Sequence, residues 1–152
     1  MGCIPNNSFT PRGWLKRIPT MLDVVAAALI DQSCRVLMQQ RRADRQHGGL
    51  WEFPGGKLEP GETAVSGLMR EIREELGLGL VEPDLSWLAK AQDPGAGIVI
   101  NLYMCRRWQG VPRCLDAQQI GWFTLEELDQ LAMPPLDRPL AEAVKEVLGS
   151  AN

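Results

Sequence analysis

The stretch from residue 54 to residue 77 limits what this chain can fold into more than any other part of the sequence. It opens with PGGKLEPG, which is so rich in Gly and Pro that we expect a loop. Thr63 is suited to cap a helix that runs to Leu76 and ends at Gly77. The end of this helix reads REIREEL, with five charges in seven positions. A glycine-rich loop leading directly into a strongly charged helix is therefore the best-defined local structure.

Three carboxylates are expected on one side of that helix. At about 100° per residue, Glu74 lies about −60° and Glu75 about +40° from Glu71, beside an apolar arc at about 60° to 160°. Like charges this close repel by roughly 0.2–0.5 kcal/mol per pair. An exposed, salt-bridged face with Arg70 would explain the charges, but such a face lies opposite the core, whereas this one borders it. The pattern predicts a site for a hard divalent cation such as Mg²⁺.

Hydrophobic periodicity places the remaining elements. We expect strands at 22–30, 35–40, 51–53, 85–92, 98–108 and 120–123, and helices from Thr124 and over 138–148. The 22–30 strand is a nearly continuous apolar run, which is typical of a strand buried on both faces. The order predicts one mixed α/β domain over residues 21–150, after a loose N-terminal extension over residues 1–20.

Composition excludes several classes of partner. The 152 residues include 16 basic and 19 acidic ones, a formal charge of −3, without a long Lys/Arg block. Duplex nucleic acid is therefore not expected as a partner, since phosphate neutralisation supplies most of that affinity. No long apolar run indicates a membrane span. The four cysteines form no C-x-x-C pair, which favours reduced thiols and a cytoplasmic protein.

From Gly56 the spacing G-x5-E-x7-R-E-I-x-E-E-x-G-L resembles the box of the Nudix hydrolase family at every defined position. The matching residues are Gly56, Glu62, Arg70, Glu71, Ile72, Glu74, Glu75, Gly77 and Leu78. The segments WEFPGGKLEPGET, QQRRAD and PPLDRPL resemble the MutT-like branch, which sanitises nucleoside triphosphate pools. The likeness runs from about Leu22 to Leu148 and implies the Nudix fold, a mixed β-sheet sandwiched between helices (α/β/α).

The resemblance also implies a reaction and its catalytic residues. The enzyme would be a Mg²⁺-dependent pyrophosphohydrolase, with Mn²⁺ as a substitute, that releases nucleoside monophosphate and pyrophosphate from substrates such as 8-oxo-dGTP. It would act on free nucleotides in DNA repair, as a monomer or homodimer. The implied metal ligands are Glu71, Glu74 and Glu75, with Gly56 letting the loop backbone approach the metal. Glu62 would support the metal site and Arg70 would orient a carboxylate.

Four further residues would bind substrate. Lys57 and Arg41 match MutT-like cations that face the phosphates, and Phe53 would wall the base pocket unless it is a core aromatic. Asp137 stands where the MutT pattern has Asn. An ionised Asp only accepts hydrogen bonds, so it suits the donor-rich edge of guanine or 8-oxoguanine, and cytosine only if it is protonated. Asp137 could instead be the N-cap of the last helix.

The sequence departs from the MutT pattern at Gly121, where these enzymes often have a Glu before the equivalent of Trp122. This leaves Glu71 as a candidate general base, with Asp116 or Gln118 as possible replacements. A cytidine-nucleotide pyrophosphohydrolase (CTP or 5-methyl-dCTP) is an alternative within the same style of sequence. Pro94 lies near the distance typical of ADP-ribose hydrolases, although a hairpin turn also explains it. A non-catalytic nucleotide sensor would be expected to lose the acidic residues, which are intact here.

Overall fold

The computed structural model describes residues 21–150, so the extension predicted over residues 1–20 lies outside the described residues. The larger sheet has the order β4-β1-β6-β5, with β1 parallel to β6 and the other pairs antiparallel. Its strands are β1 (Leu22–Leu29), β4 (Gly55–Lys57), β5 (Leu85–Asp93) and β6 (Ile98–Cys105). A second, antiparallel sheet joins β3 (Trp51–Glu52), β2 (Val36–Gln40) and β7 (Gln119–Phe123) in the order β3-β2-β7.

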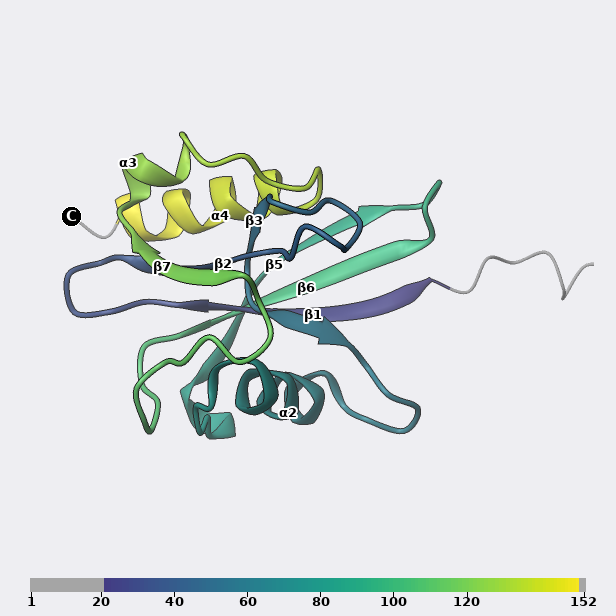
Figure 1. Ribbon diagram of the computed structural model, residues 1–152. Helices are drawn as coiled ribbons and strands as arrows, with labels where there is room; N and C mark the ends of the chain where they lie inside the picture. Colours follow the sequence, from purple (N-terminus) through teal and green to yellow (C-terminus); the bar gives the residue numbers. More distant parts are fainter. Residues whose placement is uncertain (1–20, 151–152) are drawn as a thin grey trace, which may run out of the picture.

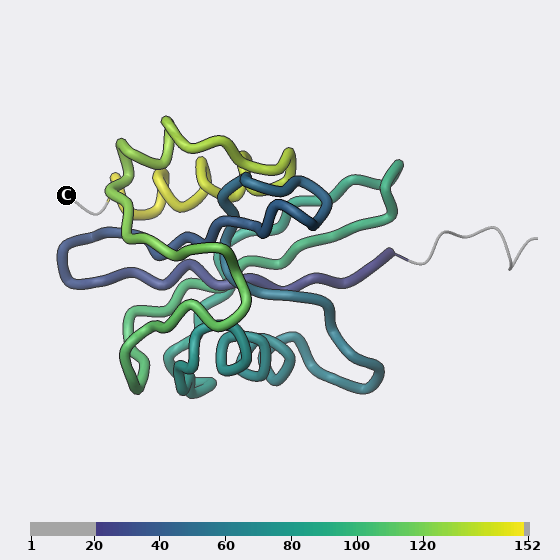
Figure 2. The backbone as a smooth tube through the Cα atoms, viewed as in Figure 1, coloured from purple at the N-terminus to yellow at the C-terminus, as the bar shows by residue number. Residues whose placement is uncertain are grey.

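Helices cover the sheets on both sides (Figure 1). Helix α2 (Ala64–Leu76) lies on one side, and α3 (Leu125–Leu128) with α4 (Asp137–Gly149) lies on the other, while the short 3₁₀ helix η1 (Glu82–Asp84) precedes β5. The predicted α/β/α arrangement is confirmed, with the strands divided between two sheets. Figure 2 shows loop 41–50 and the β4–α2 connection on the side of the β5–β6 turn, away from the β1–β2 turn. None of the helices in the described part of the chain has the length and apolar character needed to cross a membrane.

Strand β1 is buried on both faces, as its apolar run predicts. Val25, Ala27 and Leu29 belong to the core cluster packed against α2, and Ala26 and Ala28 belong to the cluster under α4. A central strand with helices on both sides cannot alternate apolar and polar residues. The burial of β1 therefore explains why the sequence of residues 22–30 lacks a strand-like alternation.

Helix α2 begins and ends where the sequence indicates. The Thr63 hydroxyl accepts the Ser66 N–H at 3.1 Å, and the Ser66 hydroxyl accepts the Thr63 N–H at 3.1 Å, forming a reciprocal capping box. Gly77 ends the helix in the left-handed conformation, with φ of 71°. Both ends are thus fixed locally, the first by side-chain hydrogen bonds and the second by the backbone conformation of a glycine.

The loop predicted over residues 54–61 is partly wrong, because it contains strand β4. Gly56 pairs with Val25 and Gly55 with Ala26. A Cβ atom on Gly55 would lie 2.0 Å from the Val25 carbonyl oxygen, so glycine is what allows this close pairing. Gly and Pro content indicates a loop locally, but here the glycine serves a long-range strand contact.

Asp137 does not cap α4, so that alternative is wrong. Asp137 is the first residue of the helix and the N-cap position is held by Leu136, whose side chain cannot accept a hydrogen bond. The Asp137 Oδ1 instead accepts the backbone N–H of Phe53 at 3.1 Å. The side chain thus connects the start of α4 to the end of β3.

Pro94 lies in the β5–β6 hairpin turn. The Gly97 N–H donates to the Pro94 carbonyl at 3.2 Å, and the Asp93 carboxylate accepts the Gly95 N–H at 3.0 Å. These bonds close a tight turn, so the turn accounts for this proline without a substrate role.

Candidate active site

Arg70 ties the loop to helix α2. Its Nε and Nη2 atoms each donate to a different carboxylate oxygen of Glu62 at 2.8 Å, and its Nη1 donates to Glu71 at 2.9 Å. A further bond reaches the Lys57 carbonyl at 3.2 Å. The hydrogen bonds from Arg70 lower the pKa of Glu62 to about 2. The structure thus brings Arg70, Glu62 and Glu71 together, in the arrangement expected if Arg70 orients a carboxylate.

Gly56 provides the space for the Glu71 carboxyl group. A Cβ atom at Gly56 would lie 2.4 Å from Glu71 Cδ and 2.5 and 2.6 Å from its two oxygens. Burial raises the pKa of Glu71, which the contact with Arg70 opposes. The missing side chain of Gly56 therefore lets a half-buried carboxylate lie directly against the loop backbone.

Glu75 is the most buried carboxylate of α2, with 9% of the residue exposed. Its Oε2 accepts the Gly55 N–H at 3.0 Å and the Gln39 Nε2 at 3.2 Å. Burial, and after it the negative charge of Glu71, raise its pKa to about 8. A cation beside Glu75 and Glu71 would stabilise their ionised forms.

Glu74 differs from the other two box carboxylates. Its side chain is 59% exposed and lies 3.3 Å from Arg70 Nη1, at the outer edge of the helix. Across residues 21–150, no three Asp, Glu, His or Cys side chains are gathered closely enough to hold a metal ion. The residues nevertheless fit a magnesium ion, because Glu71 and Glu75 crowd negative charge into a partly buried place and carboxylate oxygens are the ligands that Mg²⁺ prefers.

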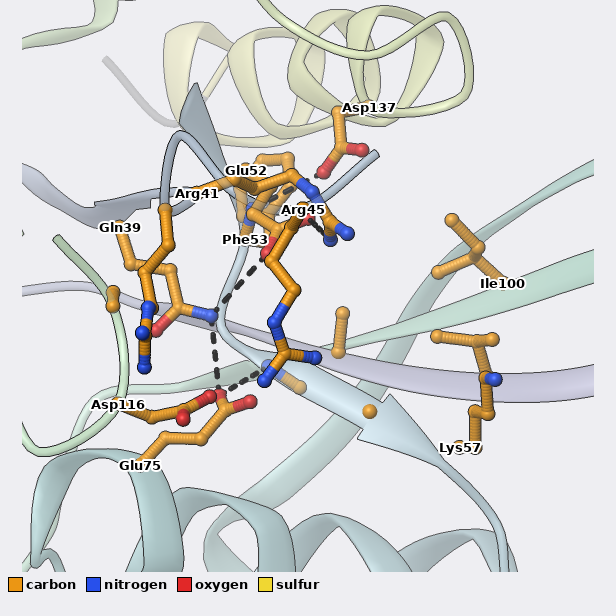
Figure 3. Close-up of a pocket in the computed structure, with 16 residues that line it drawn as sticks. Gln39, Arg41, Arg45, Glu52, Phe53, Lys57, Glu75, Ile100, Asp116 and Asp137 are labelled. Carbon is orange, nitrogen blue, oxygen red and sulfur yellow. Dashed lines mark hydrogen bonds and ion pairs between the residues drawn. The ribbon is translucent and has the colours of Figure 1, made fainter. Parts of the chain in front are cut away.

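A cavity of about 330 Å³ opens beside Glu75 (Figure 3). Six of the predicted residues line it: Arg41, Phe53, Gly56, Lys57, Glu75 and Asp137. Glu62, Arg70, Glu71 and Glu74 lie outside this lining, behind Gly56 or along α2. Figure 3 shows Asp137 at the α4 end of the cavity and Glu75 at the α2 end. The volume is in the range of small-ligand sites.

Asp137 is a buried carboxyl at one end of this cavity, with only 6% of the residue exposed. Burial, together with the charge of Glu52, raises its pKa to about 7, against the opposing effects of the Phe53 N–H and the charge of Arg41. Asp137 is therefore close to the point at which protonated and ionised forms coexist at neutral pH.

Arg41 already has partners inside the protein. Its Nη1 pairs with Glu52 Oε2 at 2.8 Å, and its Nε donates to the Gln46 carbonyl at 2.7 Å. Burial raises the pKa of Glu52 in spite of this ion pair. Lys57, at the end of β4, is an exposed cation on the cavity lining. Of the two cations predicted to face phosphates, Lys57 is thus the more accessible.

Gln39 is a site residue that the sequence reading missed. It is 4% exposed, and its Nε2 lies 3.2 Å from a Glu75 oxygen and 3.5 Å from a Glu52 oxygen. Because both partners are acceptors, the amide oxygen faces away from them, and within residues 21–150 it has no hydrogen-bond partner. Residues two apart in a strand point to the same face of the sheet, so Gln39 shares a face with Leu37, which packs against α2. This alternation is the signal in the sequence that could have placed Gln39 beside the carboxylates of α2.

The structure leaves little space for a side chain at Gly121, where MutT-like enzymes often have Glu. A Cβ atom there would lie 3.1 Å from the Phe123 ring, which packs edge-on against Trp51. A carboxylate at this position would therefore point at aromatic rings. Asp116 lines the cavity, whereas Gln118 donates its backbone N–H to the Gln40 carbonyl at 3.0 Å. Of the two possible replacements, only Asp116 is on that lining.

Comparison with known proteins agrees with the box and the fold. The NUDIX domain family matches residues 20–144. The chain belongs to the NUDIX hydrolase family. It is 37% identical over 125 residues to the CTP pyrophosphohydrolase of Escherichia coli (strain K12), covering 81% of this chain and 90% of that one. It is 27% identical to the 8-oxo-dGTP diphosphatase of the same organism, covering 82% and 96% of the two chains.

A solved structure shares the fold. The solution structure of the E. coli ORF135 protein superposes with a TM-score of 0.75 at 34% identity, covering 86% of this chain and 93% of that one. The protein is therefore a MutT-like Nudix pyrophosphohydrolase that acts on small nucleotides. Nudix hydrolases in general use divalent metal ions such as Mg²⁺. The roles of individual residues stay predictions.

Proposed function

We propose that this Nudix hydrolase converts nucleoside triphosphates, 8-oxo-dGTP and dGTP among them, into nucleoside monophosphate and pyrophosphate. The observation that carries the proposal is the position of Asp137, a buried carboxyl that leaves its own helix uncapped and lines the same cavity as Glu75. A base at the Asp137 end would direct its phosphates toward the α2 carboxylates. We assign this activity to a domain spanning residues 21–150.

The carboxylates of Glu71, Glu74 and Glu75 would hold Mg²⁺, or Mn²⁺ in its place, against the Gly56 backbone. When bound, the cation draws charge from phosphate oxygens and activates the attacking water. Arg70 fixes Glu71, and Gly55 with Gln39 fixes Glu75. We assign Glu71 as the general base, because burial raises its pKa and Gly121 offers no carboxylate.

Asp137 would recognise the base by accepting hydrogen bonds from the N–H groups of the base. One of its oxygens holds the Phe53 N–H, so the carboxylate still has lone pairs for a substrate. Guanine presents N1–H and an exocyclic amine, and 8-oxoguanine adds N7–H. Two adjacent donors match an ionised carboxylate, which only accepts hydrogen bonds. Phe53 would form one wall of this base pocket.

Cytidine nucleotides are a second candidate, favoured by the pKa of about 7 at Asp137. A protonated carboxyl has one donor and one acceptor. It could donate to cytosine N3 and accept from the neighbouring amine. The relative with 37% identity is named a CTP pyrophosphohydrolase, which supports including these substrates.

The test is to measure kcat/KM for 8-oxo-dGTP, dGTP, CTP, 5-methyl-dCTP and ADP-ribose side by side at saturating Mg²⁺. We expect pyrophosphate release from the triphosphates, with a guanine nucleotide preferred at pH 8. A higher kcat/KM for ADP-ribose than for every triphosphate would overturn the proposal. Tight nucleotide binding without any hydrolysis would instead indicate a nucleotide sensor.

A further inference from the structure

We propose that Arg45 binds the terminal phosphate of the substrate and so makes the enzyme prefer nucleoside triphosphates to diphosphates. The proposal rests on the hydrolysis of nucleotides in the cavity described above. It assigns a specificity role to Arg45, which lies outside the Nudix box and directly after the QQRRAD segment, in loop 41–50.

Arg45 is distinguished by what its neighbours bind. Four cations line the cavity: Arg41, Arg42, Arg45 and Lys57. Arg41 is paired with Glu52 at 2.8 Å, and Arg42 with Asp44 at 3.2 Å. Over the described residues 21–150, no carboxylate lies within 4.0 Å of the Arg45 guanidinium, which makes no hydrogen bond there either. Its five N–H donors are thus available to a ligand.

The direction of the side chain places this charge at the carboxylate end of the cavity. Figure 3 shows Arg45 extending from its loop toward Glu75 and away from Asp137. Asp137 is the group suited to a base, so a cation at the opposite end would meet phosphate oxygens. Arginine recognises phosphate through paired N–H···O bonds, which are among the strongest hydrogen bonds in proteins.

The loop backbone holds Arg45 in place before any ligand binds. The Arg45 N–H donates to the Arg42 carbonyl at 3.1 Å, and the Arg45 carbonyl accepts the Gly48 N–H at 3.0 Å. The Gly49 N–H closes the loop onto the Arg41 carbonyl at 2.9 Å. Because these turns fix the Cα position, ordering the side chain costs less on binding.

Arg45 lies nearer the surface than Glu75 does, and this difference in depth matches Arg45 to the terminal phosphate. Glu75 is buried and accepts the Gly55 N–H, whereas Arg45 is an exposed residue on a surface loop. The bond that breaks must lie near the carboxylates and their metal. The phosphate farthest from the base would then project outward, toward Arg45. A diphosphate lacks this outermost group and would gain less from the guanidinium.

The experiment measures kcat and KM for dGTP and dGDP in the wild type, Arg45→Ala, Arg45→Lys and the control Arg106→Ala, which removes an exposed arginine outside the cavity lining. We expect Arg45→Ala to lower kcat/KM for dGTP by about ten-fold or more, mainly through KM, because a hydrogen bond to a charged group is lost. The dGDP value should change by less than about two-fold. Arg45→Lys should recover part of the loss, and Arg106→Ala should match the wild type.

Equal losses for dGTP and dGDP would overturn the proposal, as would a loss that depends on the base. If the wild type hydrolyses neither nucleotide, the proposed function fails, and the role of Arg45 is decided by binding. Calorimetry with inorganic tripolyphosphate and pyrophosphate, in Mg²⁺, then compares the wild type with Arg45→Ala. A preference for tripolyphosphate that disappears in the variant supports the role, and identical binding by the two proteins overturns it.

Discussion

The carboxyl group of Glu71 lies where a side chain on Gly56 would otherwise be. A Cβ atom at that position would be 2.4 Å from Glu71 Cδ, much closer than two carbon atoms pack. Arg70 holds the same carboxyl at 2.9 Å. The glycine that begins the Nudix box and the glutamate on its helix are thus fitted to each other across the loop.

We therefore expect Gly56→Ala to reduce activity more than stability. The added methyl group must displace the Glu71 carboxyl, and a displacement of about 1 Å at an active site can lower the rate roughly a hundred-fold. The displaced atoms are the end of a flexible side chain, so the melting temperature should change little. Steady-state kinetics and thermal unfolding of one preparation measure both effects.

Gly55→Ala is the matched control for that variant. Its methyl group would meet the Val25 carbonyl oxygen at 2.0 Å, and a backbone atom in the central strand cannot move aside as a side chain can. Gly55→Ala should therefore unfold at a clearly lower temperature than Gly56→Ala. Full activity in Gly56→Ala would contradict the fitted position of Glu71.

Local signals predict α2 and β1 well but not β4. The apolar run of β1 lies within that strand, and the caps Thr63 and Gly77 lie directly beside α2 in the sequence. Strand β4 depends on pairing Gly55 and Gly56 with β1, about thirty residues earlier in the sequence. Its Gly content indicates a loop, so a non-local contact overrode the local signal.

The box residues could be named from the sequence, but their different surroundings could not. Helical spacing places Glu71, Glu74 and Glu75 on one side, yet the structure buries Glu75 and leaves Glu74 at the outer edge. Burial depends on what the loop and β2 place over each carboxylate. Arg45 was not predictable for a related reason, since nothing in a polar loop indicates which arginine makes no ion pair with the rest of residues 21–150.

Glu75→Gln should abolish activity without destabilising the metal-free protein. The pKa of Glu75 is raised to about 8 from its usual 4.5, so the unfolded chain loses the proton first and the fold loses stability as pH rises through that range. Gln carries no charge, so in EDTA at pH 8.5 the variant should melt at or above the wild-type temperature. Mg²⁺ should raise the melting temperature of the wild type only, because a ligand stabilises the state that binds it.

Glu74, the exposed residue next to Glu75, provides a comparison for that result. Glu74→Gln should leave the free energy of unfolding within about 0.5 kcal/mol of the wild type, because its side chain is 59% exposed. As a predicted metal ligand, Glu74 should still be needed for turnover. Near-normal kcat in either Gln variant at saturating Mg²⁺ would show that its assignment as a ligand is wrong.

Lys57→Ala should weaken catalysis by the same factor for every nucleoside triphosphate. The side chain is an exposed cation on the cavity lining, at the end of β4, and a contact with phosphate carries no information about the base. Measuring kcat/KM for dGTP, CTP and 8-oxo-dGTP tests this. A loss confined to one base would place Lys57 in the base pocket instead.

Asp137→Asn should remove a pH-dependent loss of stability. The pKa of Asp137 is raised to about 7 from 3.8, so wild-type stability should fall as pH rises from about 4 to 7, by about 1.4 kcal/mol per unit of pKa shift. Asn keeps an oxygen that can accept the Phe53 N–H but cannot ionise. Denaturant unfolding of both proteins at pH 5 and pH 8 measures the difference. Glu52 and Arg41, whose charges act on Asp137, are present in both proteins, so only the ionisation of Asp137 is removed.

The same variant decides what Asp137 does for the substrate. Asn has a donor group and an acceptor group at every pH, so the preference of the variant between guanine and cytidine nucleotides should not change with pH. The wild type should favour cytidine nucleotides at pH 6 and change toward guanine nucleotides at pH 8, where Asp137 is ionised. Because a buried group without its partner costs about 1–3 kcal/mol, the ranking at pH 8 should differ between the two proteins by roughly ten-fold or more. If kcat/KM ratios for dGTP and CTP are equal in both proteins at both pH values, Asp137 serves only to hold the Phe53 backbone, and the proposed reading of the base is wrong.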